Sequence, residues 1–462
     1  MVVDMTTGSP IKRILRFFVP VLLGNLLQQL YSMADSVIVS RFVGVKAFAG
    51  VTETGSLNFL IIGFTLGMCM GFAIPISQEF GAGDLAEMRR CFSNSIIISA
   101  VFSVILAAVT AVLTPQILHL IGAPEDIFDY SCTYIRIIFI GIPATVFYNL
   151  FAGAMRAVGD GRTPLIMLVC SCILNIGLDL LFIIKFNMGV AGAAIATILA
   201  QIVSVVLCVM VIFRKDGALR PRKDEWKTDG ERVHRLIGNG IPMGLQFSIT
   251  AIGSVILQTS VNGISEDAVA SITAGSKLSS LFTGAYDALS GTVAVFAGQN
   301  LGAGKLKRIR EGVKDASILG TAYSMCATLI LWLFAMPLVG LFVDAGETAV
   351  TEMTVHYLRV NSSAYIPLMF VNVLRLAVQG MGHTRVAMIA GATEMAARCA
   401  VAMLLVPLFA FDAACLANPA AWVAADIFLF PCYFITLKKA RLRHETALLR
   451  TAERQKEAEH TV

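Results

Sequence analysis

The residues best suited to chemistry lie in the first long apolar run of the chain, residues 14–39. The polar members of this run recur at intervals of three and four, which places them on one face of a helix. They are Asn25, Gln28, Gln29, Ser32 and Asp35. Because an acid near the centre of a bilayer costs several kcal/mol, we expect this face to meet other helices or a water-filled cavity, with Asp35 in a functional role. The alternative for the amides is that they only join helices together.

A second candidate acid lies in the fifth apolar segment, where Asn175 and Asp179 are four residues apart and share a helix face. Asn149 in the fourth segment and Thr197 in the sixth are further polar candidates. If these helices pack together, Asp179 meets Asp35, and two adjacent carboxylates in a low dielectric cannot both ionise cheaply. Such a site takes up a proton, or a Na⁺ ion held by oxygens of Asp35, Asn175 and Asp179. A hydrogen-bonded packing network is the alternative.

Composition identifies the class of protein. The chain has 462 residues, of which 56% are hydrophobic and 15% charged, whereas a soluble globular protein carries about 25% charged residues. Only a polytopic membrane protein fits these values. The net charge of +5 does not indicate nucleic-acid binding, because the basic residues lie in short loops and at the ends. The ten cysteines show no CxxC and no metal-ligand pattern, so we expect them to serve in packing.

Twelve apolar segments follow one another along the chain. The polar stretch 214–236 divides them into two sets of six, which predicts an all-α membrane protein with two pseudo-symmetric six-helix lobes. The predicted lobes are 1–213 and 237–438, joined by a cytoplasmic linker, and 439–462 is a cytoplasmic tail. The segments are 14–39, 48–76, 93–117, 131–153, 164–185, 189–213, 237–259, 270–297, 316–340, 355–378, 387–407 and 414–437.

The two halves are predicted to be copies of each other, because landmark residues repeat in the same order at a nearly constant separation. The matching pairs are Pro20 and Pro242, Pro115 and Pro337, Gln78 and Gln299, Asn149 and Asn372, Gly159 and Gly382, and Arg162 and Arg385. Six helices per copy is an even number, so both copies insert in the same orientation, as in transporters with two bundles around a central site. Pro20 and Pro242 also remove a backbone hydrogen bond each and are predicted to let their helices bend.

Charge in the loops predicts the orientation in the membrane. Lys and Arg concentrate at the two ends of the chain and in the loops on the same side, which places both termini in the cytoplasm. Two of these loops carry Gly-Ala-Gly, at 81–83 and 302–304. They lack the Lys-Ser/Thr of a phosphate-binding loop and no strand precedes them, so we expect tight turns and no nucleotide binding.

The second half offers a different set of ionisable residues. No acid stands at the positions that match Asp35 and Asp179. Glu394 and Arg398, four residues apart, are expected to form an ion pair within one helix. Asp287, in a run of small residues, is expected to line a cavity.

These residues resemble the multidrug and toxic compound extrusion (MATE) family, in its bacterial DinF-like branch, over nearly the whole chain. The resemblance is carried by PVLLGNLLQQLYSMADSVIVSRFVG, by ISQEFGAGDLAEMRR and its echo AGQNLGAGKLKRIREG, and by MRAVGDGRTP and GVAGAAIATILAQ. It implies cation-coupled efflux of amphipathic organic cations by alternation of the two lobes. The family's first-lobe cation site falls on Asp35, Asn149, Asn175, Asp179 and Thr197. Another branch uses a glutamate in helix 7, where this chain has no acid around Gln246.

We therefore expect a multidrug antiporter of the bacterial inner membrane, coupled to H⁺ or Na⁺, working as a monomer without an enzymatic activity or a bound cofactor. Its substrate cavity is predicted to include Asn25, Gln28, Ser32, Gln246 and Asp287. The alternatives are a lipid-linked oligosaccharide flippase of the same superfamily, which would call for more cavity-facing arginines, and a non-transporting sensor or assembly protein, which would not need the two acids.

Overall fold

The computed structural model describes residues 3–214, 217–343 and 346–460, and most of them are helical. A backbone in hydrocarbon has to satisfy its own N–H and C=O groups, so long apolar runs form helices. The first half contains α1 (Pro10–Phe42), α2 (Val45–Glu53), α3 (Gly55–Ala82), α4 (Leu85–Leu120), α5 (Glu125–Ile140), α6 (Ile142–Ala157), α7 (Arg162–Leu180), the π-turn η1 (Leu181–Lys185) and α8 (Gly189–Ile212). The second half contains the 3₁₀ turn η2 (Lys223–Trp226), α9 (Gly230–Asn262), α10 (Glu266–Gly302), α11 (Leu306–Val339), α12 (Thr348–Ser363), α13 (Tyr365–Gly380), α14 (Thr384–Ala400), the π-turn η3 (Val401–Leu405) and α15 (Val406–His460).

The helices given above correspond to the twelve predicted membrane spans once the bent helices are joined and one kinked helix is divided. α5 and α6 form one span with a bend of 49°, and α12 and α13 follow each other directly at Ala364. The chain turns inside α15 at Ala410, whose φ of 45° and ψ of −120° are not helical. The residues before Ala410 therefore continue α14, and those after it form the last span. With the short α2 set aside, each half contributes six spans, so the predicted all-α fold is confirmed.

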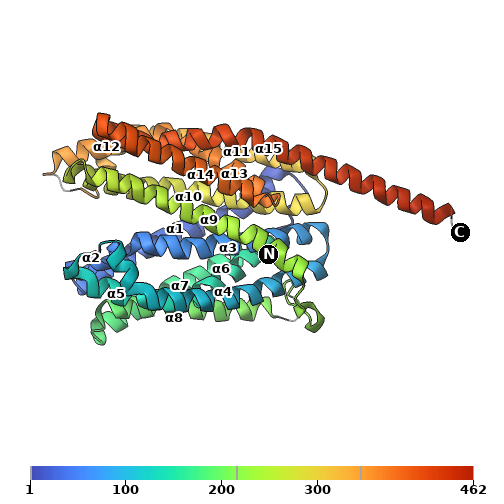
Figure 1. The fold of residues 1–462 in the computed structure, drawn as a ribbon, viewed down its shortest axis with the longest axis horizontal. Helices are drawn as coiled ribbons and strands as arrows, with labels where there is room; N and C mark the ends of the chain where they lie inside the picture. Colours follow the sequence, from blue (N-terminus) through green and yellow to red (C-terminus); the bar gives the residue numbers. More distant parts are fainter. Residues whose placement is uncertain (1–2, 215–216, 344–345, 461–462) are drawn as a thin grey trace.

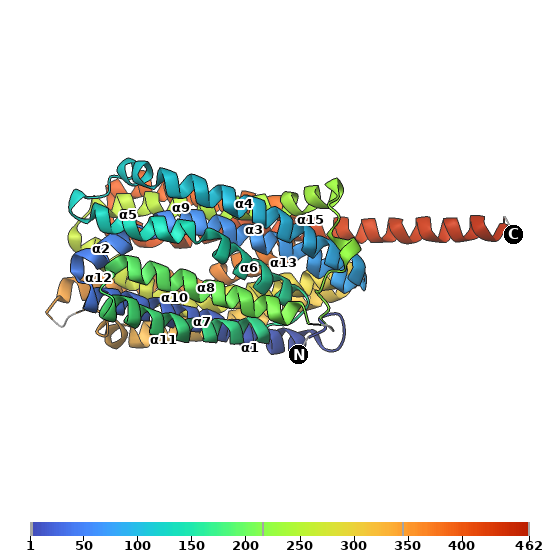
Figure 2. The same ribbon diagram turned by 90° about the horizontal axis from the view of Figure 1, so that it is seen from below.

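The two halves form two layers of helices, α1–α8 in one and α9–α15 in the other (Figure 1). The view from below shows the same bundle, with the end of α15 projecting beyond one extremity (Figure 2). One apolar core lies within the first lobe, and two lie mainly within the second. α1 belongs to both lobes, because Ile14 and Phe17 near its start are buried in a core of the second.

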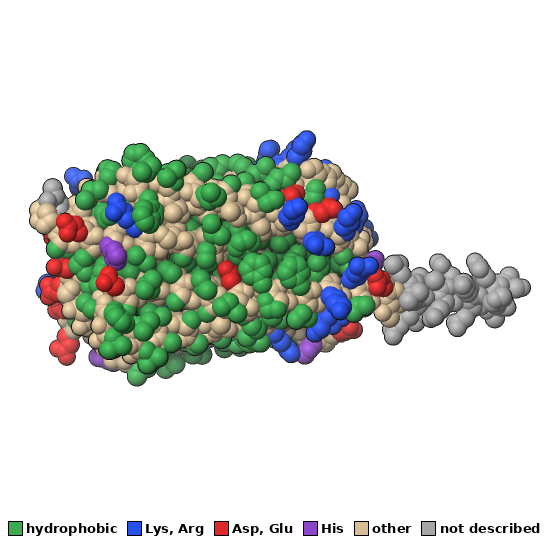
Figure 3. Space-filling view, turned by 90° about the horizontal axis from the view of Figure 1, so that it is seen from above, with side chains coloured by type: hydrophobic (Ala, Val, Ile, Leu, Met, Phe, Trp, Pro, Cys, Tyr) green, Lys and Arg blue, Asp and Glu red, His purple; other side chains and the backbone are tan. Residues whose placement is uncertain are grey.

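Charge divides the molecule along its long axis. Lys and Arg side chains gather at the end from which α15 projects, which we call the basic end, while Asp and Glu gather at the opposite, acidic end (Figure 3). A broad hydrophobic band lies between them. At the basic end α9 begins at Gly230, inside the stretch predicted as linker, because Arg232 and Arg235 form ion pairs with Glu87 and Glu79 of the first lobe and extend the helix beyond the apolar band.

The two Gln-x-x-Gly-Ala-Gly motifs meet each other at the basic end. A Cβ atom on Gly81 would lie 1.9 Å from Gln299 O, and one on Gly302 would lie 1.8 Å from Gln78 O. These distances leave no room for any residue larger than glycine. The motifs are therefore more than turns, since they bring the backbones of the two lobes into direct contact, which we call the basic-end contact.

Residues 3–8, the N-terminal strap, reinforce the basic-end contact. Val3 N donates a hydrogen bond to Gly159 O of the first lobe at 2.9 Å, and Met5 N donates to Gln299 Oε1 of the second at 3.0 Å. Val3 and Met5 are buried in a core of the second lobe. The lobes are thus joined at this end by backbone contact, by side-chain amides and by the strap.

Candidate functional site

Two acids that are far apart in the sequence meet inside the first lobe. Asp35 lies on α1 and Asp179 near the end of α7, and their carboxyl groups lie close enough to interact with each other. Asp179 is fully buried and Asp35 is half-buried. A hydrogen bond between two carboxyl groups needs a donor, and an ionised carboxylate has none. The two acids can therefore share a hydrogen bond only when one of them is protonated, so the arrangement suits the uptake of a proton.

Asn175 supports this pair from one turn earlier on α7. Its side chain is 1% exposed. With the amide oriented so that both of its ends are satisfied, Nδ2 donates to Asp179 Oδ2 at 2.8 Å and Oδ1 accepts from Thr197 N at 3.1 Å. The amide thus fixes Asp179 to α8 and offers it a hydrogen-bond donor. Thr197 Oγ1 donates to Ala193 O within its own helix at 3.1 Å.

Two tyrosines near the acids were not among the predicted site residues. Tyr31 lies one turn before Asp35 on α1, with its hydroxyl 3.5 Å from Thr197 Oγ1, and it is close enough to interact electrostatically with both acids. The buried Tyr134 of α5 also interacts with both. The spacing of four residues between Tyr31 and Asp35 could have identified the first tyrosine. No local signal connects Tyr134 with α1 or α7, because only the packing of α5 brings it there.

Oδ1 of Asp35 and Oδ1 of Asp179 are buried and have no hydrogen-bond partner. Buried polar atoms without partners are costly, so this site has spare capacity for a small ligand with positive charge. Within the described parts of the chain, no three His, Cys, Asp or Glu side chains are gathered as a metal site would require. The two acids suit a proton, or a monovalent cation completed by neutral oxygens.

The structure brings four of the five predicted coupling residues together, and the fifth lies apart from their hydrogen bonds. Asn149 is on α6, and its amide donates to Thr145 O of the same helix at 2.9 Å. Thr145 in turn donates to Gln201 Oε1 on α8. This second polar pair therefore ties α6 to α8.

The π-turn η1 begins at Leu181, two residues after Asp179. Turns of this kind widen the helix locally and are frequent at functional sites. On the partner helix, Pro20 is accommodated inside the continuous α1, and Pro242 inside α9. The acids thus lie between a helix with a missing backbone hydrogen bond and a helix with an irregular turn.

The predicted cavity residues divide into exposed and buried groups. Gln28, Ser32 and Asp287 are exposed, and Asp287 is exposed although its neighbours in the middle of α10 are buried. Asn25 Nδ2 donates to Gly284 O of α10 at 3.3 Å, so it joins the lobes. Gln246 is 6% exposed and accepts a hydrogen bond from Gln379 inside the second lobe.

The ion pair expected between Glu394 and Arg398 is present at 3.9 Å, but it is the weaker of two. Arg375 of α13 lies 2.6 Å from the same carboxylate. Sequence spacing pointed to Arg398 because it lies on the same helix. Arg375 becomes the nearer partner only when α13 packs on α14.

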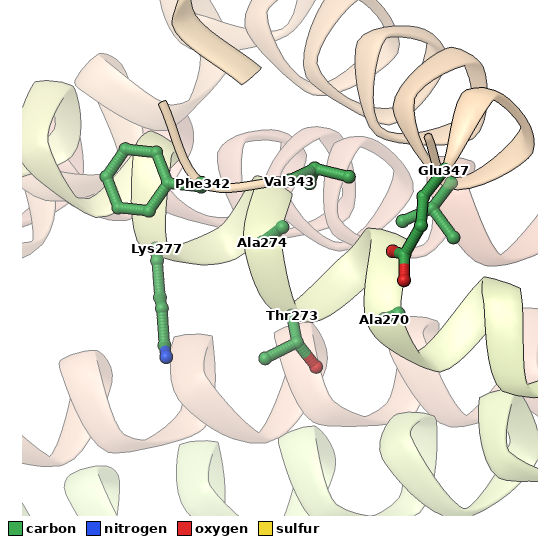
Figure 4. Close-up of a pocket in the computed structure, with 8 residues that line it drawn as sticks. Ala270, Thr273, Ala274, Lys277, Phe342, Val343 and Glu347 are labelled. Atoms are coloured by element: carbon green, nitrogen blue, oxygen red, sulfur yellow. The ribbon is translucent and has the colours of Figure 1, made fainter. Parts of the chain in front are cut away.

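A separate cavity of about 340 Å³ lies toward the acidic end, between α10 and the start of α12 (Figure 4). None of the acids described above lines it, and its own charged residues are Lys277 and Glu347. Its lining residues are Ala270, Thr273, Ala274, Lys277, Phe342, Val343, Glu347 and Val350.

Known proteins match the chain over most of its length. The family model described as MatE matches residues 20–181 and, separately, residues 242–404. The probable multidrug resistance protein YpnP of Bacillus subtilis is 29% identical over 346 residues, 74% of this chain and 77% of the relative. The FAD transporter of Shewanella oneidensis is 25% identical over 416 residues, 87% of this chain and 88% of the relative. A solved outward-facing structure of a multidrug resistance MATE family transporter has a TM-score of 0.90 and 21% identity, and covers 95% of this chain and 98% of that chain.

Proposed function

This chain belongs to the MATE family, and on that premise we propose that it exports amphipathic organic cations, drugs among them, across a bacterial inner membrane in exchange for H⁺ or Na⁺. The protein is a multi-pass membrane transporter and not an enzyme. The observation that carries the proposal is the close pair of Asp35 and Asp179 inside the first lobe. Several relatives, YpnP among them, are named multidrug resistance proteins.

The geometry around Asn175 supports a proton as the coupling ion. Its amide nitrogen points to Asp179 and its oxygen to the backbone of α8. Asn175 in this orientation stabilises an ionised Asp179 and does not present an oxygen to Na⁺. Sodium coupling would need both carboxylates and a rotation of this amide, so the proton is the better fit.

α1 is the element that would transmit coupling to the lobes. It carries Asp35 in its second half, bonds to α10 through Asn25, and is anchored by Ile14 and Phe17 in a core of the second lobe. A change of charge at Asp35 therefore acts on a helix that both lobes hold. Pro20 lies between the anchored start and the acid, where a missing hydrogen bond lets the two parts move differently.

In the proposed cycle, the lobes part alternately at the two ends. In this structure they are joined at the basic end, and in our proposal this end and both termini face the cytoplasm because Lys and Arg gather there. A proton taken up from outside neutralises the acid pair and lowers affinity for the cationic substrate, which leaves outward. The proton is released after the basic end opens. An exchange of one proton for one monovalent cation moves no net charge and is driven by the proton concentration gradient alone. Each further proton moves one net charge, and one charge crossing about 100 mV supplies about 2.3 kcal/mol, enough for roughly 50-fold accumulation.

Efflux of ethidium from cells that overexpress the chain tests the proposal. It is measured with and without a protonophore and at low and high Na⁺, for the parent and for Asp35→Asn and Asp179→Asn at matched expression. Asp412→Asn is the control, because its side chain is 75% exposed and lies outside the site. We expect both site variants to lose efflux and the control to keep it. Site variants that pump like the parent would refute coupling at this pair.

The same cells can be loaded with a flavin dinucleotide, because one relative is named an FAD transporter. If the cells export the flavin but not ethidium, the proposed substrate class changes from organic cations to anions. The dependence on Asp35 and Asp179 would still decide whether the acid pair couples transport.

A further inference from the structure

The second lobe contains a cluster of five ionisable residues contributed by four helices. Four of them are 4–8% exposed and therefore lie well inside the lobe. The fifth, Asp287, is exposed and interacts electrostatically with Arg375. The members are Asp287 on α10, Arg375 on α13, Glu394 and Arg398 on α14, and Asp426 on α15.

Glu394 is well paired within this cluster, whereas Asp426 is not. Arg375 Nη2 lies 2.6 Å from Glu394 Oε2, and Arg398 Nη2 lies 3.9 Å from Glu394 Oε1. Arg398 Nε also donates to Asn418 Oδ1 at 3.1 Å. Asp426 interacts electrostatically with Arg375 and Glu394, but its Oδ1 atom is buried and has no hydrogen-bond partner.

Other buried atoms of the cluster also have no partners. They are Arg375 Nε, Arg398 Nη1 and, beside them on α13, Gln379 Oε1. A network of ionised groups that is only partly satisfied is unstable in a low dielectric. The side chains of the cluster therefore do not satisfy one another completely, which leaves capacity for a small species.

The charge balance indicates what this species is. Three acids and two guanidinium groups leave one net negative charge if all five are ionised, and an uncompensated charge within a membrane is costly. One proton brings the cluster to neutrality. Glu394 has guanidinium partners on two sides, and Asp287 has access to water. Asp426 has neither two guanidinium partners nor access to water, so its ionised form is the least stabilised of the three acids.

We propose that Asp426 is a protonated carboxylic acid, which makes the second lobe a proton-binding site separate from the pair of Asp35 and Asp179. Arg375 lies in the field of both acids and balances whichever one is ionised.

The surroundings of Asp426 leave few other groups to titrate with it. Among the described helices that pack against α15, α13 contributes Arg375, and α14 contributes Glu394 and Arg398. α12 contributes His356, which pairs with Asp412 at the acidic end. Gln246 of α9 and Gln379 of α13 are neutral and are bonded to each other.

The protonation of Asp426 does not depend on the proposed export function and can be tested without transport. Infrared spectra of the purified protein in lipid report the C=O stretch of protonated carboxyl groups, which ionised carboxylates lack. We expect Asp426→Asn to lose one such band and Asp412→Asn, an exposed acid on the same helix, to lose none. In Asp287→Asn, which removes the exposed acid of the cluster, the Asp426 band should remain.

An unchanged protonated-carboxyl spectrum in Asp426→Asn would overturn the proposal. If that variant does not fold, Asp426→Glu keeps the acid and should move the band, and an unmoved band would overturn the proposal as well. Loss of that band in Asp287→Asn would assign the proton to Asp287 and would overturn the proposal. Asp35→Asn should remove a different band, so failure of the first-lobe site and failure of this one are distinguishable.

Discussion

Gln78 and Gln299 occupy matching positions in the two halves of the chain, and each donates its side-chain amide across the boundary between the lobes. Gln78 Nε2 donates to Gly380 O at 3.0 Å, and Gln299 Nε2 donates to Ala157 O at 2.8 Å. Both acceptors lie at the end of the bent fourth helix of the opposite half. The duplicated motif therefore makes a pseudo-symmetric joint whose opening would let substrate and ions pass at the basic end.

Gln299→Ala is expected to loosen this joint. The substitution leaves two buried backbone groups, Met5 N–H and Ala157 C=O, without their partner, at about 1–3 kcal/mol each. A loss of about 2 kcal/mol makes local opening roughly 30-fold more frequent. Hydrogen–deuterium exchange in lipid nanodiscs should then accelerate in residues 3–8 and 157–160. Gln116→Ala, which changes an exposed glutamine near the C-terminal end of α4, is the control. Equal exchange in the two variants would contradict a role of Gln299 in joining the lobes.

Arg308→Lys is expected to free the N-terminal strap and leave the charge in place. The guanidinium of Arg308 donates to the backbone carbonyls of Met5, Thr7 and Gly8. A lysine cannot reproduce this planar set of donors. Faster exchange should appear in the strap, and Arg310→Lys, two residues along the same helix and exposed, should leave it unchanged. Identical strap exchange in the two variants would show that Arg308 does not hold it.

Asn175→Leu is expected to reduce coupled efflux at neutral pH by roughly 10- to 100-fold, because Asp179 loses a hydrogen bond to its charged form worth about 1.5–3 kcal/mol. Asn149→Leu is expected to cost less, since the Asn149 amide donates to its own helix. Initial rates of ethidium efflux at matched expression compare the two. A larger loss in Asn149→Leu would place the coupling site nearer to α6 than the structure does.

Glu225→Gln is expected to destabilise the protein in a way that depends on pH. Arg89 donates two hydrogen bonds to Glu225, and this contact holds the pKa of Glu225 below its ordinary value near 4.5. A lowered pKa contributes stability that is complete above the ordinary value and is lost as the pH falls through the lowered one. Thermal unfolding should thus separate parent and variant at neutral pH, by about 1–3 kcal/mol.

That separation should close under acidic conditions, where the parent also carries a neutral Glu225. Asp224→Asn removes a neighbouring exposed acid and serves as the control. A difference that stays constant down to acid pH would mean that the carboxylate of Glu225 is not what holds the linker to α4.

The sequence by itself determined the class, the number of spans and the duplication. Long apolar runs can satisfy their backbone in a membrane only as helices, and landmarks such as Pro20 and Pro242 repeat without any reference to contacts. It also identified Asp35 and Asp179, because an acid inside an apolar helix is costly enough to need a reason. These inferences depend on properties of single segments.

Only the tertiary structure decided which of those segments meet. Packing between helices distant in the sequence brings Tyr134 close to the acid pair and makes Arg375, instead of Arg398, the nearest partner of Glu394. It also brings the two Gly-Ala-Gly turns into contact with each other. Asp426 is also an acid inside an apolar segment, but only the packing of α13 and α14 places Arg375 and Glu394 beside it. Side-chain partners across helices follow from helix rotation and lobe contact, which no local spacing encodes.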